Sequence, residues 1–264
     1  MTSLEQLRRD LNDEQESLDV LVRDLPHAQW FRPTASPGWK VFDQVAHLTY
    51  FDRSAALALG DPEYFRRERD ELSSRSGLES IDDLTLKQFR SLEPHELVAR
   101  WRAARSSLLD AASAVGDEAR VQWYGPSLSP KSFLTARLME TWAHGVDVAD
   151  ALGVTREPTD RLAHIVHLGV ATRPWSYHVR GEEPPPGSVR VEVRGPQGDV
   201  WRVGPEDADD TVWGSAEEFC LVVTQRRHLD DTMLVTGELG RHWLLRAQAF
   251  AGAPSVGPAP KAHS

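Results

Sequence analysis

The sequence predicts an α + (α+β) protein, in which a four-helix bundle over residues 1–153 precedes a smaller α+β domain over residues 158–252. Three observations support this division. Apolar residues in the first half recur every three or four positions, as on one face of a helix. After residue 188 the pattern changes to strict alternation, which is typical of a half-buried strand. Gly153 stands at the end of the helical part, and glycine is favoured just beyond a helix.

The sequence predicts two helices before residue 60, and the second contains a histidine. Ser3 can cap a helix whose leucines recur from Leu4 to Leu25. A loop rich in Pro, Gly and Ser at 33–38 separates it from a second helix that reaches about Leu59. His47 lies inside this second helix, beside apolar residues.

The polar stretch 61–83 is expected to be irregular, and two more helices follow it. Pro94 suits the first turn of the third helix, and Gly116 ends it. Ser129-Pro130 can cap and open a fourth helix that runs to about Leu152. Four such helices joined by loops favour an antiparallel bundle, in whose interior facing helices often supply metal ligands.

The second half predicts a mixed domain. Val189, Val191 and Val193 alternate with charged residues, and the turn at 196–199 leads to a second strand at 200–203, which together indicate a hairpin. The remaining expected elements are a helix at 215–226, a strand at 232–236, a last helix at 239–251 and a disordered Pro- and Gly-rich tail at 253–264.

Composition excludes several classes of function. The formal charge of −10 argues against binding to a nucleic-acid backbone. No apolar run reaches the roughly 18 residues of a membrane span, and the start lacks the order of a signal peptide, so we expect a cytoplasmic protein. Cys220 is the only cysteine, which leaves histidine and carboxylate side chains to hold any metal.

A candidate metal site combines the second and fourth helices. Glu140 and His144 are four residues apart, so both project from one helix face. His47 is the best third ligand, because a polar group placed mid-helix among apolar residues would otherwise be buried at a cost. Two imidazoles and a carboxylate suit Zn²⁺ or another first-row divalent ion and leave a coordination position open. Asp43 and Asp147 could each orient a ligand imidazole, although ordinary helix acids would look the same.

The segments at 38–48 and 140–153 (GWKVFDQVAHL and ETWAHGVDVADALG) resemble the mycothiol-dependent maleylpyruvate isomerase family, within the DinB-like metalloproteins. This resemblance implies a DinB-like metal-binding bundle followed by an α+β domain similar to sterol carrier proteins. It also places the family's ligand pattern on His47, Glu140 and His144. The segments at 173–177 and 224–228 (RPWSY and TQRRH) are similar to an actinobacterial, metal-binding branch of the family.

The resemblance further implies that the metal binds a low-molecular-weight thiol, mycothiol, as a thiolate. The activated sulfur would attack a small electrophile, giving either a lasting S-conjugate, as in a transferase, or a transient adduct that permits isomerisation. We expect Arg173, Tyr177 and Arg226 to act on the substrate and Arg180 and Arg227 to help bind the thiol, since guanidinium groups pair well with carboxylates.

Two other functions fit the same residues. The open metal position could activate water for hydrolysis, with Asp147 as the base. The protein could also be a non-catalytic binder of metal or a small ligand. The expected partners are a thiol and a small electrophile, without nucleic acid or membrane, in a monomer or homodimer.

Overall fold

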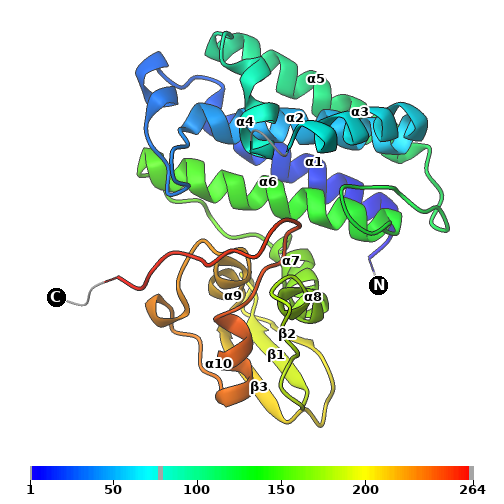
Figure 1. Ribbon diagram of the computed structural model, residues 1–264. Helices are drawn as coiled ribbons and strands as arrows, with labels where there is room; N and C mark the ends of the chain where they lie inside the picture. Colours follow the sequence, from blue (N-terminus) through cyan, green and yellow to red (C-terminus); the bar gives the residue numbers. More distant parts are fainter. Residues whose placement is uncertain (1, 77–79, 262–264) are drawn as a thin grey trace. The chain divides into compact units, whose positions relative to one another are not determined.

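The computed structural model describes residues 2–76 and 80–261. It divides into two compact units, Met1–Arg156 and Glu157–Ser264. The first is helical and the second mixes helices with a small sheet, as the sequence predicts (Figure 1). In the described ranges, no helix has both the length and the apolar character needed to cross a membrane.

Long helices dominate the first unit: α1 (Leu4–Val22), α2 (Val41–Gly60), α5 (Pro94–Ser113) and α6 (Pro130–Leu152). Helix α2 packs against α5 and α6, and α1 packs against the same two helices. Local chemistry sets the ends of α6. The Ser129 side chain accepts the N–H of Ser132 at its start, and Gly153 ends it with φ +69°.

The stretch 61–83 differs from the prediction. It contains helices α3 (Pro62–Arg75) and α4 (Ile81–Leu86), while residues 77–79 lie outside the described part. Asp61 caps α3 by accepting the N–H of Tyr64, and only Phe65 of that helix is buried. With one buried residue, α3 has no apolar period for a sequence reading to detect. Two 3₁₀ turns, His27–Phe31 and Lys87–Phe89, complete this part of the unit.

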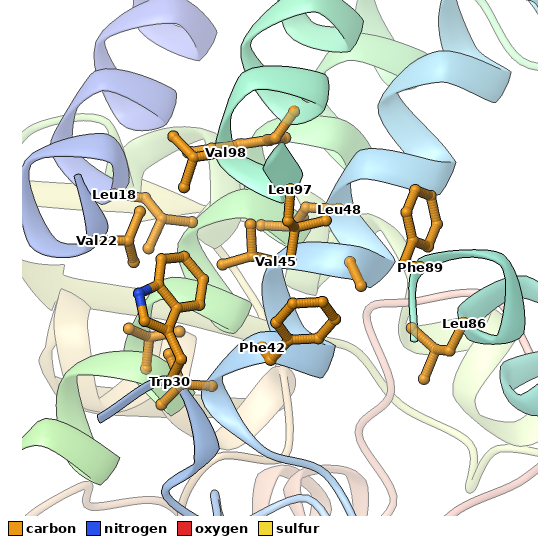
Figure 2. Close-up of a cluster of buried hydrophobic side chains, with 14 of the residues drawn as sticks. Leu18, Val22, Trp30, Phe42, Val45, Leu48, Leu86, Phe89, Leu97 and Val98 are labelled. Carbon is orange, nitrogen blue, oxygen red and sulfur yellow. The ribbon is translucent and has the colours of Figure 1, made fainter. Parts of the chain in front are cut away.

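The hydrophobic core of the first unit fixes the rotation of α2 (Figure 2). Val45 and Leu48 are completely buried in it, together with Leu18 of α1 and Leu97 of α5. Each side chain of this kind stabilises the fold by roughly 1.5–3 kcal/mol through burial. Because the neighbours of His47 in the sequence, Val45 and Leu48, are buried in this core, helix α2 cannot rotate, and the direction of the His47 side chain is fixed.

A buried carboxylate joins the four long helices. Asp52 of α2 accepts hydrogen bonds from Nε and Nη2 of Arg137 on α6, at 3.2 and 2.8 Å. Its second oxygen accepts from Nε1 of Trp101 on α5 at 3.1 Å and from Nε2 of Gln15 on α1 at 3.3 Å. The Asp52 and Arg137 side chains are 0% and 4% exposed, so the ion pair is shielded from water.

A second ion-pair cluster joins α1 to α5. Asp19 accepts from Nε and Nη2 of Arg102 at 2.7 and 2.6 Å and lies 2.9 Å from Nη2 of Arg105. The hydrogen bond from Arg102 lowers the pKa of Asp19; burial opposes this, and the charges of both arginines reinforce it. The net pKa lies below the usual range of an aspartate, so folding favours the ionised form.

The second unit contains a sheet, which in the described residues has the order β2-β1-β3. Its elements are α7 (Leu162–Ala171), α8 (Arg173–His178), β1 (Val189–Arg194), β2 (Val200–Val203), β3 (Asp210–Ser215), α9 (Ala216–Val223), a 3₁₀ turn (Leu229–Asp231) and α10 (Glu238–Leu244). Strands β1 and β2 pair antiparallel, with Val191 opposite Val203, which confirms the predicted hairpin. Strand β3 pairs parallel to β1, and α7 and α9 pack on the sheet.

Two predicted elements of the second unit are wrong. The third strand is β3, whereas the predicted strand at 232–236 forms only a single bridge from Val235 to Trp213. The last helix ends at Leu244, not at residue 251, because the following backbone bonds elsewhere: the N–H of Ala249 donates to the carbonyl of Val223.

Disorder of the tail remains a prediction. Residues 253–261 form no helix or strand, and residues 262–264 lie outside the described part. Within the tail, the hydroxyl of Ser255 lies 2.8 Å from Oε1 of Gln225, and its N–H donates to Oε1 of Gln248 at 3.2 Å.

Candidate metal centre

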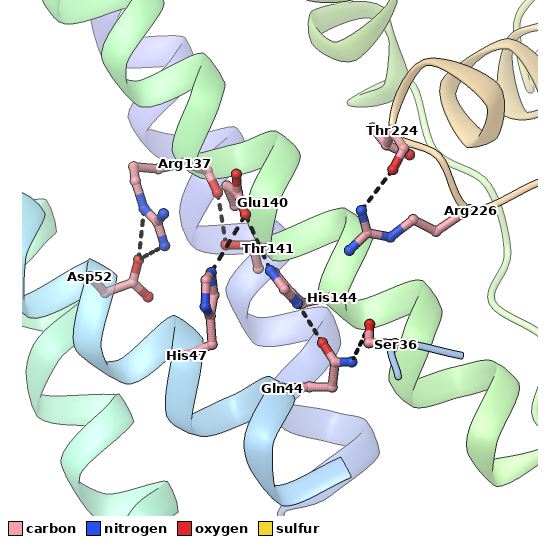
Figure 3. Close-up of polar contacts among 10 residues, drawn as sticks. All are labelled: Ser36, Gln44, His47, Asp52, Arg137, Glu140, Thr141, His144, Thr224 and Arg226. Carbon is pink, nitrogen blue, oxygen red and sulfur yellow. Dashed lines mark hydrogen bonds and ion pairs between the residues drawn. The ribbon is translucent and has the colours of Figure 1, made fainter. Parts of the chain in front are cut away.

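Three predicted ligands meet between α2 and α6 (Figure 3). Nε2 of His47 lies 3.8 Å and Nε2 of His144 3.2 Å from the same carboxylate oxygen of Glu140. One ligand atom from each residue lies within 4.8 Å of the others. Glu140 and His144 share one face of α6, and α2 brings His47 from across the interface.

Electrostatics keep the central carboxylate ionised. Burial acts to raise the pKa of Glu140, but the hydrogen bonds and charges of His144 and His47 outweigh it. The pKa of Glu140 therefore lies well below its usual range. Two imidazole nitrogens and one anionic oxygen are a donor set that fits Zn²⁺ and leaves a fourth position for a non-protein ligand. The residues present thus fit a catalytic type of metal site.

An amide, which the sequence did not suggest, contacts Nδ1 of His144. Nδ1 of His144 lies 2.5 Å from Oε1 of Gln44, which is completely buried. The carboxylate of Asp43 instead accepts the N–H of Lys40 at 2.9 Å, which caps the start of α2. Asp147 is buried one turn beyond His144 and is 3% exposed. Sequence spacing missed Gln44, because nothing along the chain links it to a residue on another helix.

Aromatic rings wall the site. Trp39 stacks on His144 at 6.0 Å and 12° and lies tilted 5.2 Å from the His47 ring. Phe51 lies 4.6 Å from the His47 ring on its own helix. In the described residues, Nδ1 of His47 is buried with no hydrogen-bond partner, so ring packing rather than a hydrogen bond fixes that side of the imidazole.

Two predicted catalytic residues lie in α8 of the second unit. Tyr177 is completely buried, and its hydroxyl lies 2.9 Å from Nδ1 of His242, whose ring stacks on it. Burial raises the pKa of Tyr177. Arg173 donates from Nη2 to the carbonyl of Gly187 at 3.2 Å. The Tyr177 hydroxyl thus interacts with His242 and with Arg173 of the same unit.

The other three predicted arginines also belong to the second unit and donate to backbone carbonyls. Nη1 of Arg180 bonds the carbonyl of Ser176 at 2.6 Å. Nη1 of Arg226 bonds the carbonyl of Thr224 and Nη1 of Arg227 bonds that of Arg226, both at 2.7 Å. Each guanidinium group therefore uses one nitrogen to bond the backbone of its own unit.

Comparison with known proteins places the candidate metal ligands inside a domain of a known family. Residues 11–149, more than half of the chain, match the family model of the mycothiol maleylpyruvate isomerase N-terminal domain. That range contains all three candidate ligands. Two uncharacterized proteins from two strains of Mycobacterium tuberculosis are each 45% identical over 249 residues, covering 94% of this chain and 96% of theirs.

Solved structures resemble the fold at low sequence identity. A crystal structure of the mycothiol-dependent maleylpyruvate isomerase matches with a TM-score of 0.59 and 14% identity, over 89% of this chain and 93% of that one. A histidine-to-alanine mutant of that isomerase matches with a TM-score of 0.57 and 14% identity, over 85% and 90%. At this identity the match concerns the fold alone.

Proposed function

Since the chain belongs to the mycothiol maleylpyruvate isomerase family, we propose that it is a metal-dependent enzyme that uses a low-molecular-weight thiol, mycothiol, to isomerise a small electrophilic substrate. The observation that carries the proposal is the convergence of His47, Glu140 and His144 on one point. A structural metal site would have four protein ligands, whereas three leave room for a reacting group.

A divalent ion such as Zn²⁺, when bound, would supply Lewis-acid activation that lowers the pKa of a thiol, so that a sulfur nucleophile exists at neutral pH. The protein's own cysteine is unsuited to that task, because Cys220 is buried and burial raises its pKa well above the usual range. The role of the chain is to present the three ligand side chains, with the Trp39 ring packed on His144 and the Phe51 ring packed on His47.

The reaction follows from thiol chemistry. The sulfur adds to one carbon of a conjugated double bond, and the π electrons move onto the adjoining carbonyl. Rotation about the resulting single bond and expulsion of the sulfur then give the other geometric isomer and return the thiol. No atoms are gained or lost by the substrate. A transferase outcome would stop after addition and retain the new carbon–sulfur bond.

We assign the first unit to the DinB-like bundles and the second to the sterol-carrier-like domains. Arg173 and Arg226 would contact an acidic substrate, Arg180 and Arg227 the thiol, and Tyr177 would act through His242. Hydrolysis with Asp147 as base is the weaker alternative, because this residue is buried and only 3% exposed.

The test is turnover of maleylpyruvate by zinc-loaded protein with and without mycothiol. We expect an isomer of unchanged mass, formed only when both metal and thiol are present. A product whose mass equals substrate plus thiol would identify a transferase. Equal turnover without any thiol would refute thiol dependence.

A further inference from the structure

We infer that Gln44 is a positioning residue that keeps the proton of His144 on Nδ1, so that Nε2 is the nitrogen presented to the metal. The inference deepens the proposed function and rests on it for its catalytic meaning. It concerns a hydrogen-bonded chain that runs from the loop before α2, through the Gln44 amide, to a ligand on α6 (Figure 3).

The first step is the contact between Gln44 and His144. Oε1 of Gln44 lies 2.5 Å from Nδ1 of His144, and an amide oxygen can only accept a hydrogen bond. Nδ1 must therefore carry a proton and donate it. When the imidazole is neutral, its lone pair is on Nε2, the nitrogen that faces Glu140 at 3.2 Å.

The second step is the orientation of the amide itself, since a flipped amide would turn its N–H toward His144 and reverse this logic. The Thr34 hydroxyl lies 3.1 Å from the carbonyl of Trp39, which can only accept. A hydroxyl has one proton, so the Thr34 oxygen must accept from its other neighbour, Nε2 of Gln44, at 2.9 Å. The second N–H of Gln44 points to the hydroxyl of Ser36 at 3.1 Å.

The amide is therefore fully satisfied and cannot flip without losing a bond. Turned over, its oxygen could accept from the Thr34 hydroxyl only if that hydroxyl turned away from the Trp39 carbonyl, so the hydrogen bond at 3.1 Å would be lost. Gln44 is 0% exposed, so water cannot compensate a poorly paired amide. Trp39 contributes twice, because its carbonyl anchors the chain and its ring stacks on His144.

The other ligand imidazole provides a contrast within the same site. Among the described residues, no group bonds to Nδ1 of His47, and its ring is held by Trp39 and Phe51. The hydrogen-bonded chain therefore acts on His144 alone. Outer hydrogen bonds of this kind are typically worth a factor of roughly 10–100 in metal affinity.

The experiment measures zinc affinity by competition with a chelator, together with the protonation of His144 by two-bond ¹H–¹⁵N NMR. Gln44→Leu removes the acceptor and should weaken zinc binding roughly 10–100-fold. Gln44→Glu keeps an oxygen against Nδ1 and should rescue the affinity. Thr34→Val is isosteric and does not contact His144. A few-fold loss of zinc affinity in this variant would show that the Thr34 hydroxyl fixes the orientation of the Gln44 amide. Gln15→Leu changes an equally buried glutamine and should leave zinc affinity unaltered.

In the wild type, with or without zinc, NMR should find Nδ1 of His144 protonated, and Gln44→Leu should lose that preference. An unprotonated Nδ1 in the wild type would overturn the inference, as would wild-type zinc affinity in Gln44→Leu. If the wild-type protein binds no zinc, the proposed function fails, and the NMR result alone then decides the role of Gln44.

Discussion

The sharpest test of the scaffold is the substitution Asp52→Ala. It leaves the guanidinium of Arg137 buried without its carboxylate, which typically costs about 3–5 kcal/mol. It also removes the acceptor from the N–H groups of Trp101 and Gln15, each of which adds roughly 1 kcal/mol. A loss of at least about 4 kcal/mol is large against the roughly 5–15 kcal/mol that stabilise a domain.

Urea unfolding followed by far-UV circular dichroism measures this loss. With an m-value of about 2 kcal/mol/M, the midpoint should fall by roughly 2 M. Asp52→Asn retains one oxygen acceptor, so its urea midpoint should lie between those of the wild type and Asp52→Ala. This variant keeps the test usable if the alanine variant does not fold. The control is Glu68→Ala, which breaks the partly exposed pair with Arg53 and should cost less than about 1 kcal/mol. Equal losses for Asp52→Ala and Glu68→Ala would refute the reasoning.

Three further predictions concern the first unit. Glu140→Ala should remain folded yet lose its metal by elemental analysis; full occupancy would rule out the site. Gly145→Ala puts a Cβ 2.6 Å from Nη1 of Arg156 and should cost about 1 kcal/mol net in urea unfolding, whereas Gly116→Ala, with nothing within 4 Å, should stay within about 0.5 kcal/mol. Asp19→Asn should destabilise the protein less at pH 3 than at pH 7, because a carboxyl whose folded pKa is below its unfolded value of about 3.9 progressively loses its contribution as the pH falls from the unfolded toward the folded pKa. A stability difference between Asp19→Asn and the wild type that grows on acidification would contradict this prediction.

Features with local causes could be predicted from the sequence. Ser129 and Gly153 mark the two ends of α6 because a cap and a left-handed closing residue act within a few positions of the chain. The hairpin of β1 and β2 is local in the same sense. The approach of Glu140 to His144 is too, because helical spacing alone brings them together.

Features whose causes lie far apart in the chain could not be predicted from the sequence. Strand β3 pairs parallel with β1, and its sequence DTVWGS has little alternation of its own. The predicted strand at 232–236 has more apolar residues, yet Val235 reaches only one partner, at the outer side of β3. Strand formation depends on which neighbour has an unoccupied edge, and intrinsic preference does not reveal that.

The residues that contact His144 show, within one site, the same limit of prediction from sequence. Spacing along the chain nominated Asp43 and Asp147, because residues three or four apart share a helix face. Asp43 is instead three residues into α2, where the N–H of Lys40 is an unsatisfied donor and attracts a carboxylate. The amide that contacts Nδ1 of His144 comes from another helix, and only the packing of α2 against α6 brings Gln44 there. A neutral amide also suits that position, since it accepts from Nδ1 while donating to the loop at 34–39, which a carboxylate cannot do.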